Sequence, residues 1–228
     1  MKKIKVGQIG KGGFGKKILS KLENIDNVSV EWVYGSQDKW WESDVDLDWV
    51  IIASPNEFHY EQAKHYLEKG VNVFCEKPGT LSTHSLLELI SHSEVKDVCF
   101  YVDDVLIYED ILPTDNFVYK KWGGLSANII DRMAYHHFYL THDMINGSDG
   151  IPTNINVTTN NLRHKVFEVE FDDFKFKYEY DFGWFKEKVH TITPRFGGDA
   201  LEAMLSSVLH KEVAFDLNHK RSIDNTHY

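Results

Sequence analysis

The sequence predicts an α/β protein in which an N-terminal Rossmann-like domain, built on a doubly wound parallel sheet, precedes a smaller C-terminal α+β domain with an open antiparallel sheet. Two observations predict this fold class. In the first hundred residues, short apolar segments alternate with segments whose apolar residues recur at helical spacing. After Pro152, apolar and polar residues alternate with a period of two, as in half-buried antiparallel strands. We therefore expect domains at 1–104 and 105–228.

In the first domain each predicted strand is followed by a turn or a predicted helix, and this rhythm favours parallel strands covered by helices on both faces. The segment FGKKILSKLENI, for example, carries Phe14, Ile18 and Leu22 at helical spacing. Gly70 is expected to end the helix that precedes it. The predicted strands are 3–10, 28–35, 46–54, 71–75 and 97–103, and the predicted helices are 14–25, 57–70 and 83–95.

The second domain is expected to be a strand meander with helices before and after it. Its strands have one apolar, aromatic face and one charged face. The predicted strands are 154–160, 165–173, 175–183 and 186–194, and the predicted helices are 133–145 and 197–210.

Composition excludes several classes of partner. Hydrophobic residues make up 42% of the 228 residues, which is enough for a sizeable core. With 35 acidic against 25 basic residues the net charge is −10, so we expect no nucleic-acid partner and no membrane attachment. The N-terminal lysines precede no signal-peptide core and no apolar run reaches spanning length, which predicts a cytoplasmic protein. Neither Cys75 nor Cys99 lies in a CxxC pair, and we expect no metal site.

A glycine-rich turn follows the first predicted strand. Gly10, Gly12 and Gly15 form a GxGxxG pattern, with Gly13 and Phe14 between them. In dinucleotide-binding folds the first glycine permits a tight turn, the second lets the backbone approach a pyrophosphate, and the third lets the helix pack against the sheet. The helix N-terminus then offers N–H groups and partial positive charge to the phosphates. We assign these five residues to cofactor binding; the alternative is a glycine-rich turn without a ligand.

The end of the second predicted strand bears on the choice between NADP and NAD. An NAD site usually has an acid there, on the ribose hydroxyls. Here the strand ends in YGSQ, and Asp38 comes one residue later. The Ser36 hydroxyl could hydrogen-bond a 2′-phosphate, and the Lys39 ammonium could neutralise the charge of that phosphate. The sequence therefore favours NADP, with NAD as the alternative.

Three stretches together resemble the Gfo/Idh/MocA family of NAD(P)-dependent oxidoreductases. They are VGQIGKGGFG, then DWVIIASPNEFHYEQAKHYLEKGVNVFCEKP, then a histidine-containing helix with a strand meander. The middle stretch is the most specific, because it runs from a strand through Pro-Asn-x-x-His to a helix, a glycine, a strand and Glu-Lys-Pro. The similarity covers about 4–90, is weaker over 120–147 and returns at 199–218.

The resemblance implies that Lys77, in the trio Glu76-Lys77-Pro78, lies beside the nicotinamide and contacts the reacting oxygen. The position suits that role, because ligands of open α/β sheets bind beyond the carboxyl ends of the strands. A partly desolvated ammonium can hydrogen-bond a substrate hydroxyl and relay a proton. Glu76 can position or neutralise the lysine, and Pro78 fixes the turn. The alternative is a surface ion pair in a loop.

The loop after the strand 46–54 also matches the family, in its cofactor-facing segment. The match covers Ser54, Pro55, Asn56 and His59. It implies that Asn56 donates to ribose or nicotinamide oxygens and that His59 lies along the ribose. For His59, a helix-capping or core role is the alternative.

The family's second motif is Asp-x-x-x-His near the start of a helix, and its histidine acts as an acid or base. In this sequence Asp131 is followed four residues later by Tyr135, with His136 and His137 just beyond. An unperturbed imidazole titrates near neutral pH, which suits proton transfer. We assign the role to His137 first and to His136 second; the alternative is that neither is catalytic.

The resemblance implies hydride transfer between a nicotinamide and a hydroxyl or keto carbon of a carbohydrate-like small molecule. One alternative is a non-catalytic NAD(P)-binding sensor or regulatory protein, which the altered histidine motif and short second domain favour. Another is a reductase of a conjugated double bond or an imine. The aromatic face of the predicted meander exceeds what one small domain can cover, and in the family this sheet forms a subunit interface. We therefore expect a homodimer through the C-terminal sheet.

Overall fold

The computed structural model describes residues 2–108, 115–120, 137, 152–161, 163–171, 173–182, 189–190 and 199–225. The chain divides into two compact units, of which the first comprises 1–108 with 199–228 and the second comprises 109–198. Among the described helices, none is both long enough and apolar enough to cross a membrane.

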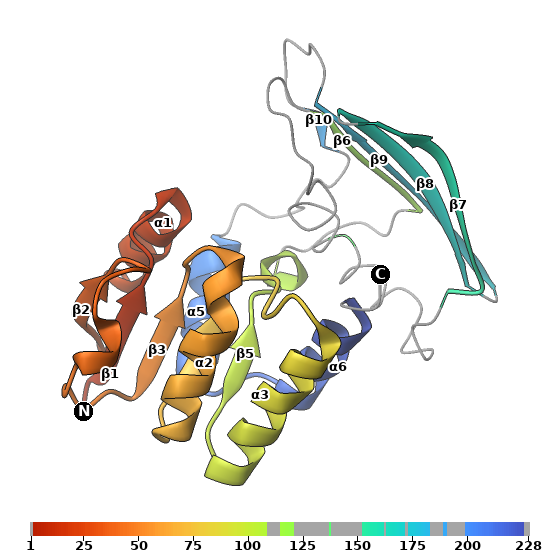
Figure 1. Ribbon diagram of the computed structural model, residues 1–228. Helices are drawn as coiled ribbons and strands as arrows, with labels where there is room; N and C mark the ends of the chain where they lie inside the picture. Colours follow the sequence, from red (N-terminus) through yellow and green to blue (C-terminus); the bar gives the residue numbers. More distant parts are fainter. Residues whose placement is uncertain are drawn as a thin grey trace. The chain divides into compact units, whose positions relative to one another are not determined.

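The first unit is built on a five-stranded parallel sheet with the strand order β2-β1-β3-β4-β5 (Figure 1). The order reverses between β1 and β3, and in such sheets ligands bind outside the carboxyl ends of the strands near this reversal. The predicted Rossmann-like sheet is therefore confirmed. Its strands are β1 (Ile4–Ile9), β2 (Val28–Tyr34), β3 (Trp49–Ile52), β4 (Asn72–Cys75) and β5 (Phe100–Val102). Its helices are α1 (Gly13–Leu22), α2 (His59–Glu68), α3 (Thr83–Lys96), α5 (Ala200–Leu209) and α6 (Phe215–Asn225). Short 3-10 turns are η1 (Trp40–Glu42), η2 (Asn56–Phe58) and η3 (Val105–Tyr108).

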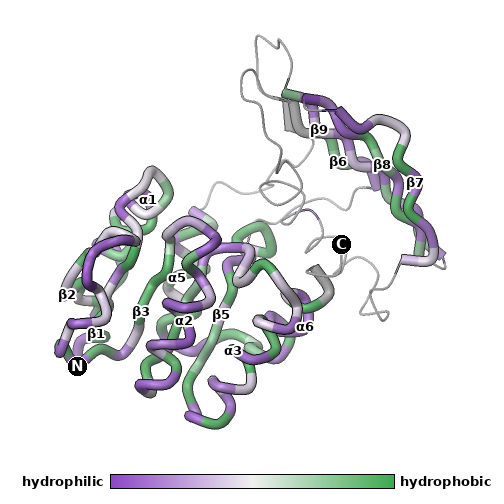
Figure 2. The backbone as a smooth tube through the Cα atoms, viewed as in Figure 1, coloured by the Kyte–Doolittle hydropathy of each residue, from purple (hydrophilic) through white to green (hydrophobic). Residues whose placement is uncertain are grey.

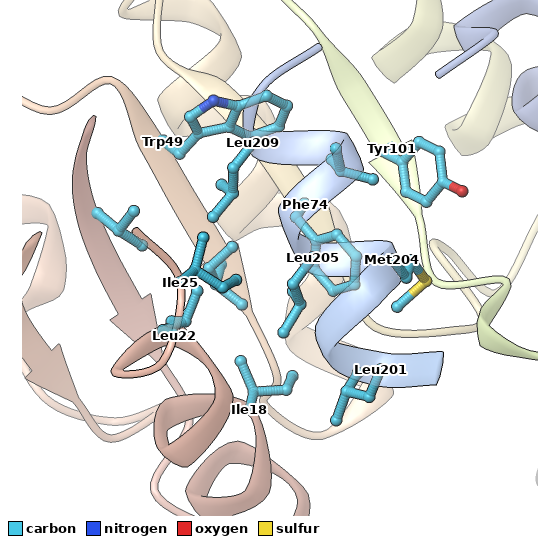
Figure 3. Packing of buried hydrophobic residues seen from close by; sticks show 13 residues of the cluster. Ile18, Leu22, Ile25, Trp49, Phe74, Tyr101, Leu201, Met204, Leu205 and Leu209 are labelled. Carbon is cyan, nitrogen blue, oxygen red and sulfur yellow. The ribbon is translucent and has the colours of Figure 1, made fainter. Parts of the chain in front are cut away.

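Helices cover both faces of this sheet, with α2 and α3 on one face and α5 on the other (Figure 1). The helix α5 begins at the cap Asp199, whose carboxylate accepts a hydrogen bond from the Glu202 N–H. Its buried residues recur at the spacing of one helical face. They pack with α1 and with Phe74 and Tyr101 of the sheet (Figure 3). Each buried aliphatic side chain contributes roughly 1.5–3 kcal/mol, so this cluster anchors α5. The buried α5 residues are Leu201, Met204, Leu205, Val208 and Leu209.

The helix α6 closes the open edge of β5 through side chains. Asn218 accepts a hydrogen bond from the Val102 N–H at 3.0 Å and donates to the Val102 carbonyl oxygen at 2.8 Å. A ring nitrogen of His219 lies 2.8 Å from the Phe100 carbonyl oxygen. These side chains occupy backbone groups that a further strand would otherwise pair. The structure thus places α5 and α6 with the first unit, whereas the sequence-based division at 104/105 grouped residues 199–228 with the second domain.

The second unit is built on a sheet with the order β10-β6-β9-β8-β7. Strands β7, β8 and β9 form the predicted antiparallel meander, but β6 pairs in parallel with β9, so the sheet is mixed. The strand β6 was not predicted. The predicted helix 133–145 lies outside the described residues, apart from His137. The strands are β6 (Asn116–Lys120), β7 (Asn154–Asn160), β8 (His164–Phe171), β9 (Phe174–Asp181) and β10 (Val189–His190).

The two faces of this sheet differ in polarity, as predicted. Hydropathy alternates along β8 and β9, whereas β3 of the first sheet is mainly apolar (Figure 2). Most of the aromatic face is buried within the chain, and Phe174 is the exception at 44% exposed. The premise that large aromatic area remains uncovered is therefore wrong for these strands; Trp184 and Phe185 lie outside the described residues. The buried members are Phe167, Phe171, Phe176, Tyr178, Tyr180 and Phe182.

Candidate functional site

The glycine turn after β1 is tightly packed at its ends and open in its middle. Gly10 has φ +120°, and a Cβ there would lie 2.2 Å from the Ala53 carbonyl oxygen. A Cβ on Gly15 would lie 2.3 Å from the Gly10 carbonyl oxygen, so α1 approaches the turn too closely for any side chain. Gly12 and Gly13, in contrast, have no atom within 4 Å of such a Cβ. The backbone is therefore bare at the point where a pyrophosphate would approach a Rossmann helix.

The N-terminus of α1 has the properties of an anion site. Gly12 is the cap residue, so no side chain accepts hydrogen bonds from the first N–H groups, and the first turn contains no acidic residue. Phe14 packs against the core cluster, so its side chain serves the fold while its backbone stays in the turn. The buried Gln8 braces the turn, because its Nε2 donates to the carbonyl oxygens of Gly10 and Gly15, each at 2.9 Å. Sequence reasoning missed Gln8, whose only signal is an amide inside an apolar strand.

After β2 the chain turns back toward the glycine turn through Asp38. Its carboxylate accepts a hydrogen bond from the Gly35 N–H at 2.7 Å and pairs with Lys11 Nζ at 2.8 Å. The hydrogen bond from Lys11 and that from Gly35 lower the pKa of Asp38 below its usual value. Lys39, in contrast, pairs with Glu42 in an exposed contact at 2.8 Å. The acid, rather than Lys39, thus lies against the glycine turn.

Ser36 contributes its backbone to this loop. Its carbonyl oxygen lies 3.3 Å from the indole nitrogen of Trp40, which donates to it. The Trp40 side chain is buried, and its backbone carbonyl oxygen accepts a hydrogen bond from the Tyr66 hydroxyl at 2.8 Å. The loop is therefore fixed to α2.

The loop after β3 is organised by His59, the first residue of α2. The ring is fully buried, with Nδ1 2.8 Å from the Pro78 carbonyl oxygen and Nε2 2.9 Å from the Ser54 carbonyl oxygen. Burial lowers the pKa of His59, and the two carbonyl contacts partly oppose this. The expectation that His59 lies along the ribose differs from this geometry, because both nitrogens face backbone oxygens and no ring edge is exposed.

Neighbouring residues of the same loop keep more freedom. The Ser54 hydroxyl donates to Gln62 at 2.6 Å. Pro55 precedes η2 with an extended backbone, and Asn56 is the first residue of that turn and is partly exposed. Asn56 thus offers a partly accessible amide to a ligand, next to the exposed Pro55 and Glu57.

The Glu76-Lys77-Pro78 trio follows β4 at the same edge of the sheet. Lys77 is only 8% exposed, so its ammonium does not lie in bulk solvent. The Glu76 N–H donates to the Ile52 carbonyl oxygen at 2.8 Å, which extends the strand pairing to the trio. The Lys77–Pro78 peptide bond is cis.

Directly across from the trio, Asp103 follows β5. It is fully buried, and its N–H donates to the Cys75 carbonyl oxygen at 2.8 Å. Burial raises the pKa of both Glu76 and Asp103; the Asp103 charge raises that of Glu76 further, and Lys77 lowers both. Sequence reasoning missed Asp103, although an acid that ends an apolar strand was its signal.

In the second unit His137 lies in an aromatic environment. The ring is fully buried, its Nδ1 is 2.7 Å from the Tyr180 hydroxyl, and it stacks on Phe117 with ring centres 5.1 Å apart. This environment is typical of a histidine that stabilises a core, and the catalytic role assigned to His137 from the sequence stays a prediction. His136 lies outside the described residues.

One group of possible metal ligands also occurs in the described part of the second unit. His164, Glu179 and Asp181 each bring a ligand atom within 4.8 Å of the others. His164 Nε2 lies 3.4 Å from a Glu179 oxygen, which is the geometry of an ion pair if the ring is protonated. Since nothing else there indicates a ligand, we assign no metal.

The bare glycine turn, the uncapped N-terminus of α1 and the charged trio all lie at the carboxyl edge of one parallel sheet, which defines an NAD(P)-binding Rossmann domain. Residues 18–104 match the family model described as an oxidoreductase family with an NAD-binding Rossmann fold (GFO_IDH_MocA). The similarity of this segment to the Gfo/Idh/MocA oxidoreductases, seen first in the sequence motifs, is therefore confirmed for residues 18–104.

Curated relatives match parts of the chain. An uncharacterized oxidoreductase of Streptococcus pneumoniae is 28% identical over 120 residues, which cover 45% of this chain and 32% of the relative. The scyllo-inositol 2-dehydrogenase (NADP(+)) IolU of Bacillus subtilis is 42% identical over 52 residues, covering 23% of this chain and 16% of the relative. The matched segments thus span a third or less of these relatives.

Solved structures resemble the chain along nearly its whole length. The UDP-N-acetylglucosamine 3-dehydrogenase GnnA of Acidithiobacillus ferrooxidans has a TM-score of 0.79 at 13% identity, covering 99% of this chain and 95% of that one. The WlbA dehydrogenase of Thermus thermophilus, solved with NAD, has a TM-score of 0.76 at 14% identity, covering 96% and 92%. At these identities the likeness shows a shared fold.

Proposed function

We propose that the chain is an NAD(P)-dependent oxidoreductase acting on a hydroxyl or keto carbon of a carbohydrate-like small molecule. The observation that carries the proposal is the buried Lys77 at the same sheet edge as the bare glycine turn. The bound nicotinamide would supply hydride transfer to or from the substrate carbon. The sugar class rests on the printed names of relatives and structural neighbours, one of which acts on an inositol and another on a nucleotide sugar.

The residues of the chain would have separate roles in cofactor binding and in catalysis. The N–H groups of Gly12 and Gly13 would bind the pyrophosphate, and Asn56 would donate to the ribose or nicotinamide amide. The Lys77 ammonium would hydrogen-bond the reacting oxygen and stabilise the negative charge that develops there. His59 would position Pro78, and through it Lys77, without touching the cofactor.

For the cofactor we propose NAD rather than the NADP that the sequence favoured. The Asp38 carboxylate beside the glycine turn could accept hydrogen bonds from ribose hydroxyls, and it would repel a 2′-phosphate. Lys39, which was expected to neutralise that phosphate, is already paired with Glu42. Lys11 offsets part of the Asp38 charge, so the preference should be moderate.

A homodimer through the second sheet stays a proposal. Its support is the edge strand β7, where the apolar side chains of Ile155 and Val157 are about half exposed. Sedimentation of the wild type and of an Ile155→Lys, Val157→Lys variant would test it, because only a dimer held by this edge should dissociate in the variant.

A second candidate function is a non-catalytic NAD(P)-binding sensor, which the enclosed, stacked environment of His137 favours. Turnover separates the two candidates. Purified protein with NAD or NADP and a panel of polyols and nucleotide sugars is followed at the reduced-nicotinamide absorbance band. Turnover that is lost in Lys77→Ala supports the enzyme, whereas cofactor binding without turnover on any substrate supports the sensor.

A further inference from the structure

Glu76 and Asp103 are brought together by the register of two neighbouring strands. In the β4–β5 pair Cys75 lies opposite Val102, so the next residues, Glu76 and Asp103, leave the carboxyl ends of adjacent parallel strands together. The hydrogen bond from the Asp103 N–H to the Cys75 carbonyl oxygen extends this register by one step. Lys77 is the next residue after Glu76. Two acids and one base thus share one small region of the sheet edge.

The Asp103 carboxylate is incompletely satisfied by the described residues. Its Oδ1 accepts a hydrogen bond from the Val105 N–H at 2.9 Å, but its Oδ2 is buried without a hydrogen-bond partner among them. The neighbouring Asp104 differs, because Tyr101 and Asn218 donate to it and Arg221 lies 3.5 Å away. Asp104 is thus held by α6 and the β5 strand, whereas Asp103 has one oxygen free to change its protonation state.

The charges of Glu76, Lys77 and Asp103 together limit how many protons the two carboxylates can hold. Glu76 is partly buried and Asp103 is fully buried, and on adjacent strand ends their carboxylates repel each other when both are ionised. One of the two therefore tends to keep its proton. With one proton on the pair, the remaining negative charge equals the positive charge of Lys77, and the three groups together are neutral. Among the described residues, Asp103 also interacts with Lys17, Cys75 and Asp104, whose pKa its charge raises, and Glu76 interacts with Cys75. The Lys77 charge lowers the pKa of His59.

We propose that Glu76 and Asp103 form a carboxylate pair that holds one proton at neutral pH and serves as the proton acceptor behind Lys77. The proposal rests on the proposed function for its catalytic meaning. Oxidation of a hydroxyl releases one proton for each hydride that the nicotinamide takes. Lys77 Nζ takes this proton as it passes one of its own to the ionised carboxylate, so that Lys77 remains an ammonium. The two carboxylates thus act on the substrate only through Lys77, which is the residue in contact with the reacting oxygen.

The experiment is a ¹³C NMR titration of carboxyl-labelled protein without cofactor or substrate, comparing the wild type with Asp103→Asn. In the wild type the midpoint of Glu76 should lie well above that of an ordinary glutamate, because burial and the Asp103 charge raise its pKa. In Asp103→Asn its midpoint should fall by about one pH unit or more, which is tenfold in proton affinity. The Asp38 signal is the internal control, because its partners Lys11 and Gly35 belong to other strands' loops and its midpoint should be the same in both proteins.

A second variant keeps the test decisive if Asp103→Asn fails to fold. Lys77→Met removes the positive charge from both carboxylates, so the midpoints of Glu76 and Asp103 should both rise. A Glu76 midpoint near that of an ordinary glutamate in the wild type, or one that moves in neither variant, overturns the pair. Because no cofactor is present, this failure is distinct from failure of the proposed function, which is seen as absent NAD(P) binding or turnover.

Discussion

The Nδ1 atom of His59 lies 2.8 Å from the carbonyl oxygen of Pro78. Through this contact, and a second from Nε2 to the Ser54 carbonyl oxygen, one buried ring joins the loops that follow β3 and β4. The turn that carries Lys77 is therefore tied, through Pro78, to the first residue of α2, and stability should be sensitive to substitution of His59.

Replacing His59 by alanine should lower the free energy of unfolding by about 2–4 kcal/mol, because one carbonyl oxygen loses its N–H donor and a buried ring leaves a cavity. Urea denaturation followed by circular dichroism measures this. His84→Ala, at an exposed position, is the control and should change stability by less than about 0.5 kcal/mol. Equal, small effects of the two variants would refute the role of the ring.

Stability should also depend on the ionisation of His59. Burial depresses its folded-state pKa below the unfolded value, so the folded protein binds this proton less readily. The contribution of His59 to the free energy of unfolding is fully present above the unfolded-state pKa of about 6.5. It is lost as the pH falls through the folded-state pKa. The wild type should therefore lose stability on acidification in that range, and His59→Gln should lose less. A midpoint of His59 above 6.5 in an NMR titration would give the opposite sign and contradict the account.

The two kinds of glycine in the turn should respond oppositely to a methyl group. Gly15→Ala should lose about 1–3 kcal/mol of stability, because its Cβ meets the Gly10 carbonyl oxygen. Gly13→Ala is the matched control, since it lies in the first turn of α1 with open space around its Cβ, and it should be neutral or stabilising by about 0.5–1 kcal/mol. Thermal melts without ligand distinguish the two, and a stable Gly15→Ala protein would contradict the close approach of α1.

Asp38 should set the preference between the two dinucleotides. In Asp38→Ser the repulsion of a 2′-phosphate is removed and Lys11 is released from its partner, so affinity for NADPH should rise relative to NADH by about tenfold. Fluorescence titration with both reduced cofactors measures the ratio. Glu42→Ser, which releases Lys39 instead, should leave the ratio nearly unchanged. A wild type that prefers NADPH would show that the carboxylate does not govern the choice.

The first sheet was predictable because apolar residues recur with a different period in its strands and in its helices. This difference can be read from short segments of the sequence. The strand β6 was missed because Asn116–Lys120 is short and is defined by its pairing with β9, far away in the sequence. The helix α6 was missed because it docks through polar side chains such as Asn218, which leave no apolar periodicity.

The site was predictable where a motif dictates backbone geometry, as at Gly10, Gly15 and the Glu-Lys-Pro trio. It was less predictable where a side chain folds back across a loop. Asp38 lies one residue beyond the usual place for an acid, and only the turn from Gly35 brings it to the glycine loop. Asp103 lies beside Glu76 because of the register between β4 and β5, and this register cannot be read from the sequence.

Dinucleotide binding at the bare glycine turn is the property on which the proposed function depends most directly. The decisive measurement is a fluorescence titration of NADH into the wild type and into Gly12→Ala, whose added methyl group meets no protein atom within 4 Å. We expect saturable binding to the wild type, displaced by NAD, and binding at least about tenfold weaker in a Gly12→Ala protein that melts within a few degrees of the wild type. A wild type that shows no saturable binding, or a variant that binds equally well, would contradict it.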